Sequence, residues 1–375
     1  MSGAKEAQDI QGFNGPGGET VRMGRPALRR AEKLAFQASQ LARLYWYAGQ
    51  GLLAARVSRR TAPPDSTAQP ATRDSGPGID ALTAELRGLI AREWENIAAG
   101  HYRAPHDLVR NPVEVLGEAL AFFRDLPKVA RRRVAQNGND LPDALAEGLP
   151  RYYRRNFHFQ TDGYLTPQSA RLYDQQVEVL FGGSAAAMRR QALVPIADFL
   201  RGRARAGLRL LDVATGTGQF LTWVKQNHPR LAVTGLDLSQ AYLDEAARRL
   251  APWSGVELRQ GAAEAIAAAD GSYDLVTSIY LLHELPRPVR ARAVAEMARV
   301  LKPGGRLVLV DSLQQGDRVD FDGLLERFPE AFHEPYYRDY VAQDLTALFA
   351  AAGLEPKRVE LVFLSKLMVF DKPPL

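Results

Sequence analysis

The stretch Leu210-Leu211-Asp212-Val213-Ala214-Thr215-Gly216-Thr217-Gly218-Gln219-Phe220 decides the fold of this 375-residue chain. An apolar run over residues 208–213 leads into a turn of small residues, and a helix-like segment follows over residues 220–227. This strand–turn–helix order is the setting that a nucleotide-binding loop requires. Gly216 and Gly218 allow the backbone to approach a ligand closely, where a Cβ would obstruct it. Taken alone, the stretch leaves an ordinary β–α turn as an equal alternative.

Two cofactor classes use such a loop, and the sequence separates them. A dinucleotide-binding loop has a third glycine three residues after the second, and Leu221 stands there. The carboxylate of Asp212, at the end of the strand, would repel a pyrophosphate and attract an ammonium group. S-adenosylmethionine (SAM) carries an ammonium group and no phosphate. The loop resembles motif I of the class I SAM-dependent methyltransferases, with Ala214 in place of the usual first glycine. The resemblance implies that the cofactor contacts Asp212, Ala214, Thr215, Gly216 and Gly218.

Asp237 ends the next predicted strand, over residues 231–239. A carboxylate at the tip of the second strand can accept two hydrogen bonds from a ribose diol. We therefore expect Asp237, with Leu238 beside it, to bind the cofactor. A helix cap or turn is the structural alternative for Asp237, because a helix is predicted over residues 240–250.

The third predicted strand and its turn, residues 256–264, depart from the family pattern at Ala262. The family commonly has an acidic residue there, which contacts the adenine amino group. We expect the backbone N–H of Ala263 to meet the ring, or the carboxylate of Glu264 to replace the missing contact. Ser278, in the fourth predicted strand, completes the expected cofactor site.

Two later blocks resemble methyltransferase motifs in order and spacing. They are YDLVTS followed by LLHELP, within residues 273–286, and LKPGGRLVLVD, residues 301–311. The helix predicted over residues 289–301 ends at the Pro-Gly-Gly turn, which leads into a strand over residues 306–311. The resemblance implies an α/β fold: a Rossmann-like, seven-stranded, mostly parallel sheet with a reversed C-terminal hairpin.

The chain divides into five predicted segments. They are a disordered tail (1–25), an amphipathic helical segment (26–60), a flexible linker (61–79), a helical cap or substrate lid (80–189) and the SAM-binding domain (190–375). The region before the SAM-binding loop is too long for a simple lead-in, so we expect the cap to lie over the cofactor site.

Residues 28–57 carry apolar side chains at helical spacing, with arginines at both ends. The stripe consists of Leu34, Leu41, Tyr45, Ala48 and Leu52. Such a helix either rests on a membrane surface or packs on its own protein or a partner. No stretch approaches the roughly 20 apolar residues that span a bilayer, and no secretion signal is evident. We expect a cytoplasmic protein, with peripheral membrane contact through residues 28–57 as an open alternative.

The chain has 48 lysines and arginines against 43 aspartates and glutamates, and no cysteine. Disulfides, thiolate metal sites and cysteine nucleophiles are therefore excluded. Arginine clusters at residues 29–30, 59–60, 131–133 and 154–155 supply the basic excess. They would suit an anionic partner or form a solvated surface. A protein or nucleic acid is not the expected partner, although an RNA methyltransferase stays an alternative.

Methyl transfer from a sulfonium requires alignment of the reacting atoms and exclusion of water. A general base is needed only where the acceptor must lose a proton. His283, after the fourth strand, and His333 are the candidate catalytic residues. Each could instead have a packing role. His101, His106, His158 and His228 are not spaced as a metal site, so we expect no metal.

Two segments dense in aromatic and polar residues, 152–165 and 332–340, are candidate acceptor-binding regions. Buried structural aromatics are the alternative. The expected acceptor contacts are Tyr164, Tyr280, Tyr336 and Tyr337, with Arg338 for an anionic group. The family often uses a tyrosine before motif I to bind the SAM carboxylate, and Tyr173 is the candidate.

The resemblance implies SAM-dependent methyl transfer, and the texture of LDVATGTG and LLHELP resembles the subgroup that acts on quinone precursors and other small molecules. We expect a small aromatic or apolar acceptor that is methylated on carbon or oxygen. A non-catalytic SAM-binding regulatory module is the alternative from another functional class.

Overall fold

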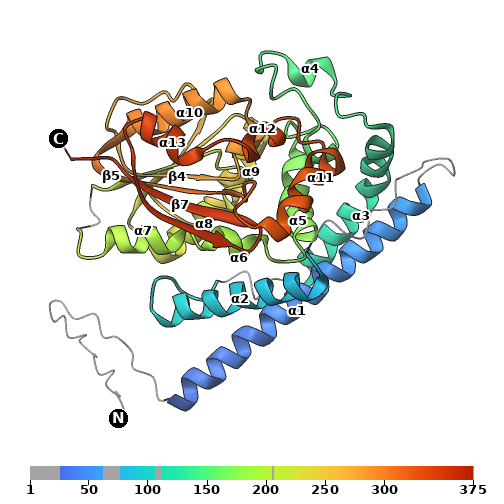
Figure 1. The fold of residues 1–375 in the computed structure, drawn as a ribbon, viewed down its shortest axis with the longest axis horizontal. Coiled ribbons are helices and arrows are strands. Elements are labelled where there is room, and N and C mark those ends of the chain that lie inside the picture. The colour runs from blue at the N-terminus through green and yellow to red at the C-terminus, as the bar shows by residue number, and fades with distance from the viewer. Residues whose placement is uncertain (1–25, 62–76, 106–111, 205–206, 375) are drawn as a thin grey trace, which may run out of the picture.

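The computed structural model describes residues 26–61, 77–105, 112–204 and 207–374. The predicted tail and most of the predicted linker lie outside these residues. Seven strands form one sheet in the order β3-β2-β1-β4-β5-β7-β6 (Figure 1). The strands are β1 (Arg209–Val213), β2 (Ala232–Asp237), β3 (Val256–Gln260), β4 (Tyr273–Ile279), β5 (Leu301–Ser312), β6 (Glu355–Val362) and β7 (Ser365–Asp371).

The first five strands run parallel, and β7 pairs antiparallel with both β5 and β6. The reversed C-terminal hairpin and the Rossmann-like sheet are therefore confirmed. Because all carboxyl ends of β1, β2 and β4 meet at one edge, the loops that follow them can build a single site.

Side chains of successive strand residues alternate between two cores, as the two-residue period of a strand dictates. Leu210 and Val308 face one core, whereas Leu211 and Leu307 face the other. The first core is covered by α6 (Ala185–Arg190), α7 (Leu193–Leu200), α8 (Gln219–Asn227) and α9 (Gln240–Leu250). The second is covered by α10 (Arg287–Val300) and α13 (Leu345–Ala351). The sheet is thus buried on both faces, which explains its almost continuous apolar strands.

Strand β5 is longer than predicted. It begins at Leu301 and includes the Pro-Gly-Gly segment, which we expected to be a turn. A register shift opposite Tyr273 and Leu275 accommodates the extra residues. Glycine is needed at position 305, because a Cβ there would lie 2.8 Å from the carbonyl oxygen of Lys302.

The N-terminal half is helical, as predicted. Its elements are α1 (Pro26–Thr61), α2 (Ile79–Ala98), α3 (Pro112–Ala135), α4 (Asp143–Ala146), the 3₁₀ helix η2 (Phe157–Phe159) and α5 (Pro167–Leu180). Helix α1 packs along α2, α3 and α5 (Figure 1). Thr166 caps α5 by accepting a hydrogen bond from the backbone N–H of Ser169, and Pro167 follows in the first turn. Helix α5 connects this cap to the sheet, because it also packs on α9.

Helix α1 packs through a different face from the apolar stripe noted in the sequence. Phe36, Gln40, Tyr47 and Gln50 are buried, and Gln50 accepts a hydrogen bond from Gln175 of α5 at 2.6 Å. All five residues of the stripe are exposed: Leu34, Leu41, Tyr45, Ala48 and Leu52. Within the described parts of the chain, no helix is long and apolar enough to cross a membrane.

Candidate functional site

The loop after β1 adopts a conformation that favours small residues. Ala214, Gly216 and Gly218 have φ angles of 63°, 54° and 74°. These values lie in the left-handed region, which explains why a glycine is usual where Ala214 stands. A Cβ on Gly218 would approach the Cβ of Ala246 to 2.9 Å, so this glycine also permits α8 and α9 to pack.

Asp212 acts as part of the framework beneath this loop. Its carboxylate accepts hydrogen bonds from the hydroxyls of Thr215, at 2.8 Å, and Thr277, at 2.6 Å. Burial raises the pKa of Asp212 to about 6, although these hydrogen bonds act in the opposite direction. The side chain does not line the cofactor cavity, so its hydrogen bonds fix the loop.

Asp237 both holds the backbone of two loops and faces a cavity, the two roles that the sequence left open. Its two carboxylate oxygens accept hydrogen bonds from the backbone N–H groups of Gly216, at 2.8 Å, and Ser239, at 2.9 Å. It also lines a cavity at the carboxyl ends of β1 and β2. Burial raises its pKa to about 6. One carboxylate thus ties the two loops together and faces the space between them.

The cavity beside Asp237 is called the cofactor cavity below. Its lining includes eight residues that we predicted: Tyr164, Tyr173, Ala214, Gly216, Asp237, Leu238, Ala263 and Tyr280. Five predicted cofactor residues do not line it: Asp212, Thr215, Gly218, Glu264 and Ser278. Glu264 instead accepts a hydrogen bond from the hydroxyl of Tyr152, at 2.7 Å, and so anchors the aromatic segment over the cavity.

That aromatic segment supplies cofactor-cavity residues that the sequence argument did not assign. Tyr152, Tyr153 and Phe157 line the cavity, together with Tyr242 of α9 and Leu281. The density of aromatic residues over 152–165 was the only signal for the first three. The enclosed volume is about 90 Å³.

Two apolar cavities of about 320 Å³ each extend from this site into the cap. The inner cavity is lined mainly by Leu180, Phe181, Leu325, Phe328, Phe332 and Leu364, with His158, His283 and Glu284 at its polar end. The cap cavity lies between α1, α3 and α5, where Gly51 and Ala54 face Phe122 and Leu126. The two share His158, Tyr173, Val177, Leu180 and Phe332. The inner cavity meets the cofactor cavity at Tyr173, Tyr280 and Glu284.

His283 lies at this junction and is held by Asp311. Its Nδ1 lies 2.5 Å from Asp311 Oδ1, while Asp311 Oδ2 accepts the backbone N–H of Leu282 at 2.8 Å. Burial alone would lower the pKa of His283, but Asp311 raises it to about 9. Near neutral pH the ring is therefore an imidazolium paired with Asp311, and its Nε2 carries a proton.

His333 does not line any of the three cavities described above. Its ring packs against Phe159, with 5.3 Å between the ring centres, and against Gly138. The backbone of His333 is left-handed, with φ of 50°, and burial lowers its pKa. This turn directs the next residue, Glu334, into the site instead.

Of the remaining predicted acceptor contacts, one lines a cavity and two do not. Tyr337 lines the inner cavity, and its hydroxyl lies 2.6 Å from Ser312 Oγ. The hydroxyl of Tyr336 accepts a hydrogen bond from Arg155 at 3.2 Å, and its side chain lies outside the three cavities. Arg338 is exposed and pairs with Glu330, so it does not reach the site.

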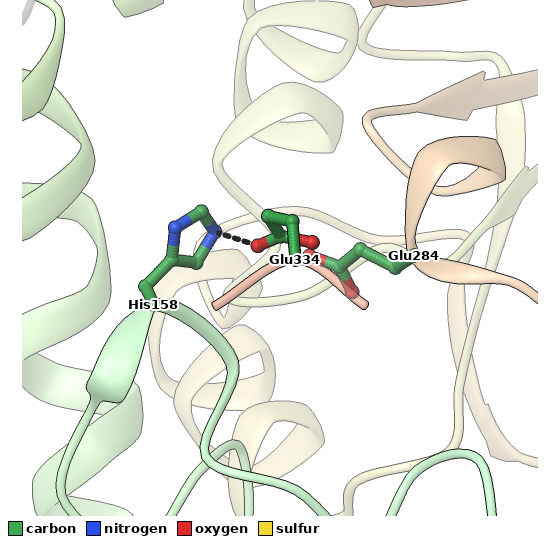
Figure 2. Close-up of side chains that lie close together, drawn as sticks. All are labelled: His158, Glu284 and Glu334. Atoms are coloured by element: carbon green, nitrogen blue, oxygen red, sulfur yellow. Dashed lines mark ion pairs between the residues drawn. The ribbon is translucent and has the colours of Figure 1, made fainter. Parts of the chain in front are cut away.

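Three side chains that the sequence did not connect converge at the junction: His158, Glu284 and Glu334 (Figure 2). The hydroxyl of Tyr164 donates to Glu284 at 2.8 Å. Burial raises the pKa of Glu284 to about 7 and that of Glu334 well above its usual range. Burial lowers the pKa of His158 to about 3. His158 had no role assigned from the sequence, and the structure places it beside two glutamates.

Several arginines of the basic clusters bind neighbouring parts of the protein. Arg132 donates to Asp140 at 2.8 Å, and Arg154 donates to the carbonyl oxygen of Leu149 at 2.7 Å. The guanidinium of Arg133 lies 5.0 Å from the ring centre of Phe332. These contacts give the arginines structural roles in the cap and do not favour an RNA-binding groove.

Comparisons with known proteins agree with this geometry. A family model described as a methyltransferase domain matches residues 210–305. A ubiquinone/menaquinone biosynthesis C-methyltransferase of Desulfotalea psychrophila is 38% identical over 104 residues, which are 28% of this chain and 41% of the relative. One of Methylobacterium nodulans is 35% identical over 168 residues, which are 44% of this chain and 62% of the relative.

A phosphatidylethanolamine N-methyltransferase of Cereibacter sphaeroides is 32% identical over 149 residues, which are 38% of this chain and 70% of the relative. The chain thus spans 41% and 62% of the length of the first two relatives. The matched region contains β1, the loop after it and the carboxylate of Asp237, which together build the cofactor cavity. The chain belongs to the class I SAM-dependent methyltransferase family.

Proposed function

We propose that this protein transfers the methyl group of SAM to a small acceptor with a largely apolar body, on carbon or oxygen. One observation carries the proposal: the cofactor cavity and the inner apolar cavity meet at Tyr173, Tyr280 and Glu284. Methyl transfer needs the donor and the acceptor to approach in a dry, aligned geometry. Two cavities that share a wall of three residues provide that arrangement.

The cofactor half would bind SAM through groups already positioned by the fold. Asp237 accepts the ribose hydroxyls, and Leu238 and Ala263 flank the adenine. The methionine part lies along Gly216 toward Tyr173, whose ring lies 5.8 Å from the guanidinium carbon of Arg189. The cavity volume of about 90 Å³ is small beside the range of about 300–1,000 Å³ of ligand pockets, so we expect the aromatic segment to shift when SAM binds.

The lining of the inner cavity is the reason for proposing an acceptor with an apolar body. Leu325, Phe328 and Phe332 exclude water, while the polar end presents His283 and Glu284 to the reacting atom. His283, an imidazolium positioned by Asp311, is the group that we expect to donate a hydrogen bond to an oxygen of the acceptor and so favour its deprotonated form. The quinone methyltransferases among the relatives support an acceptor of this class.

Membrane contact through α1 is a second proposal, carried by a different observation. Leu34, Tyr45 and Leu52 are 66%, 78% and 72% exposed, and exposed Arg30 and Arg56 lie near the two ends. An apolar and aromatic face with basic ends suits an anionic lipid surface. We expect sedimentation with phosphatidylglycerol vesicles but not with phosphatidylcholine vesicles, and loss of sedimentation when Tyr45 and Leu52 are both changed to glutamate. Equal sedimentation of this variant would contradict the proposal.

The methyl-transfer proposal is tested with SAM labelled in its methyl group and a panel of quinols and phenols with apolar chains. We expect transfer to at least one chain-bearing member. The substitution Leu325→Trp narrows the inner cavity and should raise KM for that acceptor without changing the affinity for S-adenosylhomocysteine (SAH). Tight SAH binding without transfer to any acceptor would favour a non-catalytic SAM-binding module.

A further inference from the structure

His158, Glu284 and Glu334 come from three segments far apart in the sequence. His158 lies in η2, Glu284 ends the 3₁₀ helix η3 (Leu282–Glu284), and Glu334 follows α11 (Asp322–Phe332) and His333 (Figure 2). His158 Nε2 lies 3.2 Å from Glu334 Oε1, and one donor atom of each residue lies within 4.8 Å of the others. We propose that these three side chains bind a divalent cation of the first transition series, such as Mn²⁺.

Among the described residues the two glutamates have few polar contacts: His158 Nε2 lies 3.2 Å from Glu334 Oε1, without the geometry of a hydrogen bond. The side chain of Glu334 is completely buried, and neither of its carboxylate oxygens has a hydrogen-bond partner among the described residues. Among the described residues, Glu284 accepts one hydrogen bond, from the hydroxyl of Tyr164. The nearby ring of His283 is already engaged with Asp311, with Nδ1 lying 2.5 Å from Oδ1. A buried carboxylate is costly unless it is paired or coordinates a metal. A dication would offset both glutamates at once.

The donor set and its spacing suit such an ion. One imidazole nitrogen and two carboxylate oxygens are donors that Mn²⁺, Fe²⁺ and Zn²⁺ accept, whereas softer ions prefer sulfur. With metal–ligand bonds of about 2.0–2.3 Å, adjacent ligands lie about 3 Å apart and opposite ligands about 4.5 Å apart. The observed separations, from 3.2 Å to at most 4.8 Å, fall close to this range.

The backbone is left-handed at His158 and at His333, the residue before Glu334. His158 has a φ of 55°, and His333, which directs Glu334 inward, has a φ of 50°. A non-glycine residue in this region costs on the order of 1–3 kcal/mol, and such strain concentrates at functional sites. This strained backbone brings the side chains of His158 and Glu334 to one point, which agrees with a built ligand site.

The position of the cluster defines what the cation would do, and this step rests on the proposed function. Glu284 lines both the cofactor cavity and the inner cavity, and His158 lines both apolar cavities. The remaining coordination positions of the ion therefore face the space for the acceptor. An acceptor hydroxyl or carbonyl oxygen would complete the coordination and be polarised there. The inferred substrate class is an apolar molecule that carries such an oxygen beside the methylated atom.

Calorimetric titration of the full chain with Mn²⁺, after treatment with a chelator, tests the site. We expect one ion per chain, and at least about 100-fold weaker binding in Glu334→Gln and Glu284→Gln. Glu330→Gln is the matched control, because Glu330 is exposed on α11 and pairs with Arg338. It should bind Mn²⁺ as the wild type does. Absence of Mn²⁺ binding by the wild type, or unchanged binding by Glu334→Gln, would overturn the proposal.

Two readouts distinguish this result from other failures. The melting temperature of metal-free Glu334→Gln should equal or exceed that of the wild type, so lost binding would not reflect misfolding. SAH titration of the same proteins separates the two proposals. If the wild type binds SAH but does not bind Mn²⁺, the cation site alone is contradicted. If it binds Mn²⁺ but does not bind SAH, the proposed cofactor is contradicted.

Discussion

Two pairs of carboxylates differ in how the fold satisfies them: the buried Asp212 and Asp237, and the half-buried Glu284 with the buried Glu334. Asp212 and Asp237 each accept two hydrogen bonds, from threonine hydroxyls or backbone N–H groups. Glu284 accepts one, and Glu334 accepts none. The first pair is satisfied by its own protein and fixes the loops. The second pair has few such contacts among the described residues, and it is the pair for which we propose a bound cation.

Asp237→Ala should have the largest effect, because it removes the ligand contact and the tie between two loops. Hydrogen bonds to a charged group contribute about 1.5–3 kcal/mol each, so the loss of even one ribose contact should lower SAH affinity by roughly 10- to 100-fold, measured by calorimetry. Glu264→Ala should have a smaller effect, because Glu264 holds Tyr152 and does not line the cavity. Equal affinities of wild type and Asp237→Ala would exclude this carboxylate from the cofactor site.

Thr277→Val and Glu334→Gln should change stability in opposite directions. The first removes a donor to Asp212 and should lower the free energy of unfolding by about 1–2 kcal/mol, measured in urea. The second replaces a carboxylate that has no hydrogen bond, so the metal-free protein should keep or gain stability. A clear loss of stability in Glu334→Gln would show that its carboxylate is satisfied, and the comparison would fail.

The pH dependence of SAH binding tests the ionised state of Asp237. Its pKa of about 6 in the free protein is raised by burial, so the carboxylate becomes protonated as the pH falls through 6. Protonation removes an acceptor for the ribose, and affinity should fall with a limiting slope of about tenfold per pH unit between pH 6 and 5. For folding the sign is opposite: the raised pKa means that the native state binds the proton more tightly, so this contribution to stability declines as the pH rises from about 4 to 6. Constant SAH affinity from pH 7.5 to 5 would contradict the assignment.

Ala214→Gly should have the smallest effect and a favourable sign. The φ of 63° at Ala214 strains a residue with a Cβ, whereas glycine adopts it freely. Relief of this strain is partly offset by the larger entropy of the unfolded chain, so we expect a gain of up to about 1 kcal/mol in the free energy of unfolding. Ala298→Gly, inside α10, is the control and should lose about 1 kcal/mol. Loss of stability at both positions would indicate that the loop relaxes around Ala214.

The cofactor half was largely predictable, because each of its parts is encoded within one contiguous strand and loop. The loop after β1, Asp237 and Ala263 could be aligned to a family pattern one segment at a time, and all three regions reach the cavity. The pattern could not distinguish residues whose side chains face the cavity from residues whose side chains hold the loop. Asp212 and Thr215 bond to each other beneath the turn, and only their side-chain directions reveal it.

The acceptor half was predictable only in part, because tertiary contacts assemble it. Of the predicted acceptor contacts, Tyr280 and Tyr337 line the inner cavity. His333 was favoured as the histidine of its segment, yet its left-handed backbone turns Glu334 inward instead. The partners of Glu334 lie about 50 and 176 residues earlier in the chain, in η3 and η2, and no local spacing connects them. The sequence signals of this assembly were the two aromatic segments, 152–165 and 332–340, which contain His158 and Glu334.

Calorimetric titration of the purified chain with SAH, with NADH as the control, tests the central claim most directly. Asp237 lines the cavity and suits a ribose diol, whereas Leu221 stands where a dinucleotide-binding loop has its third glycine. The account therefore predicts that SAH binds at one site per chain and that NADH does not. Binding of NADH, or of neither ligand, would contradict it.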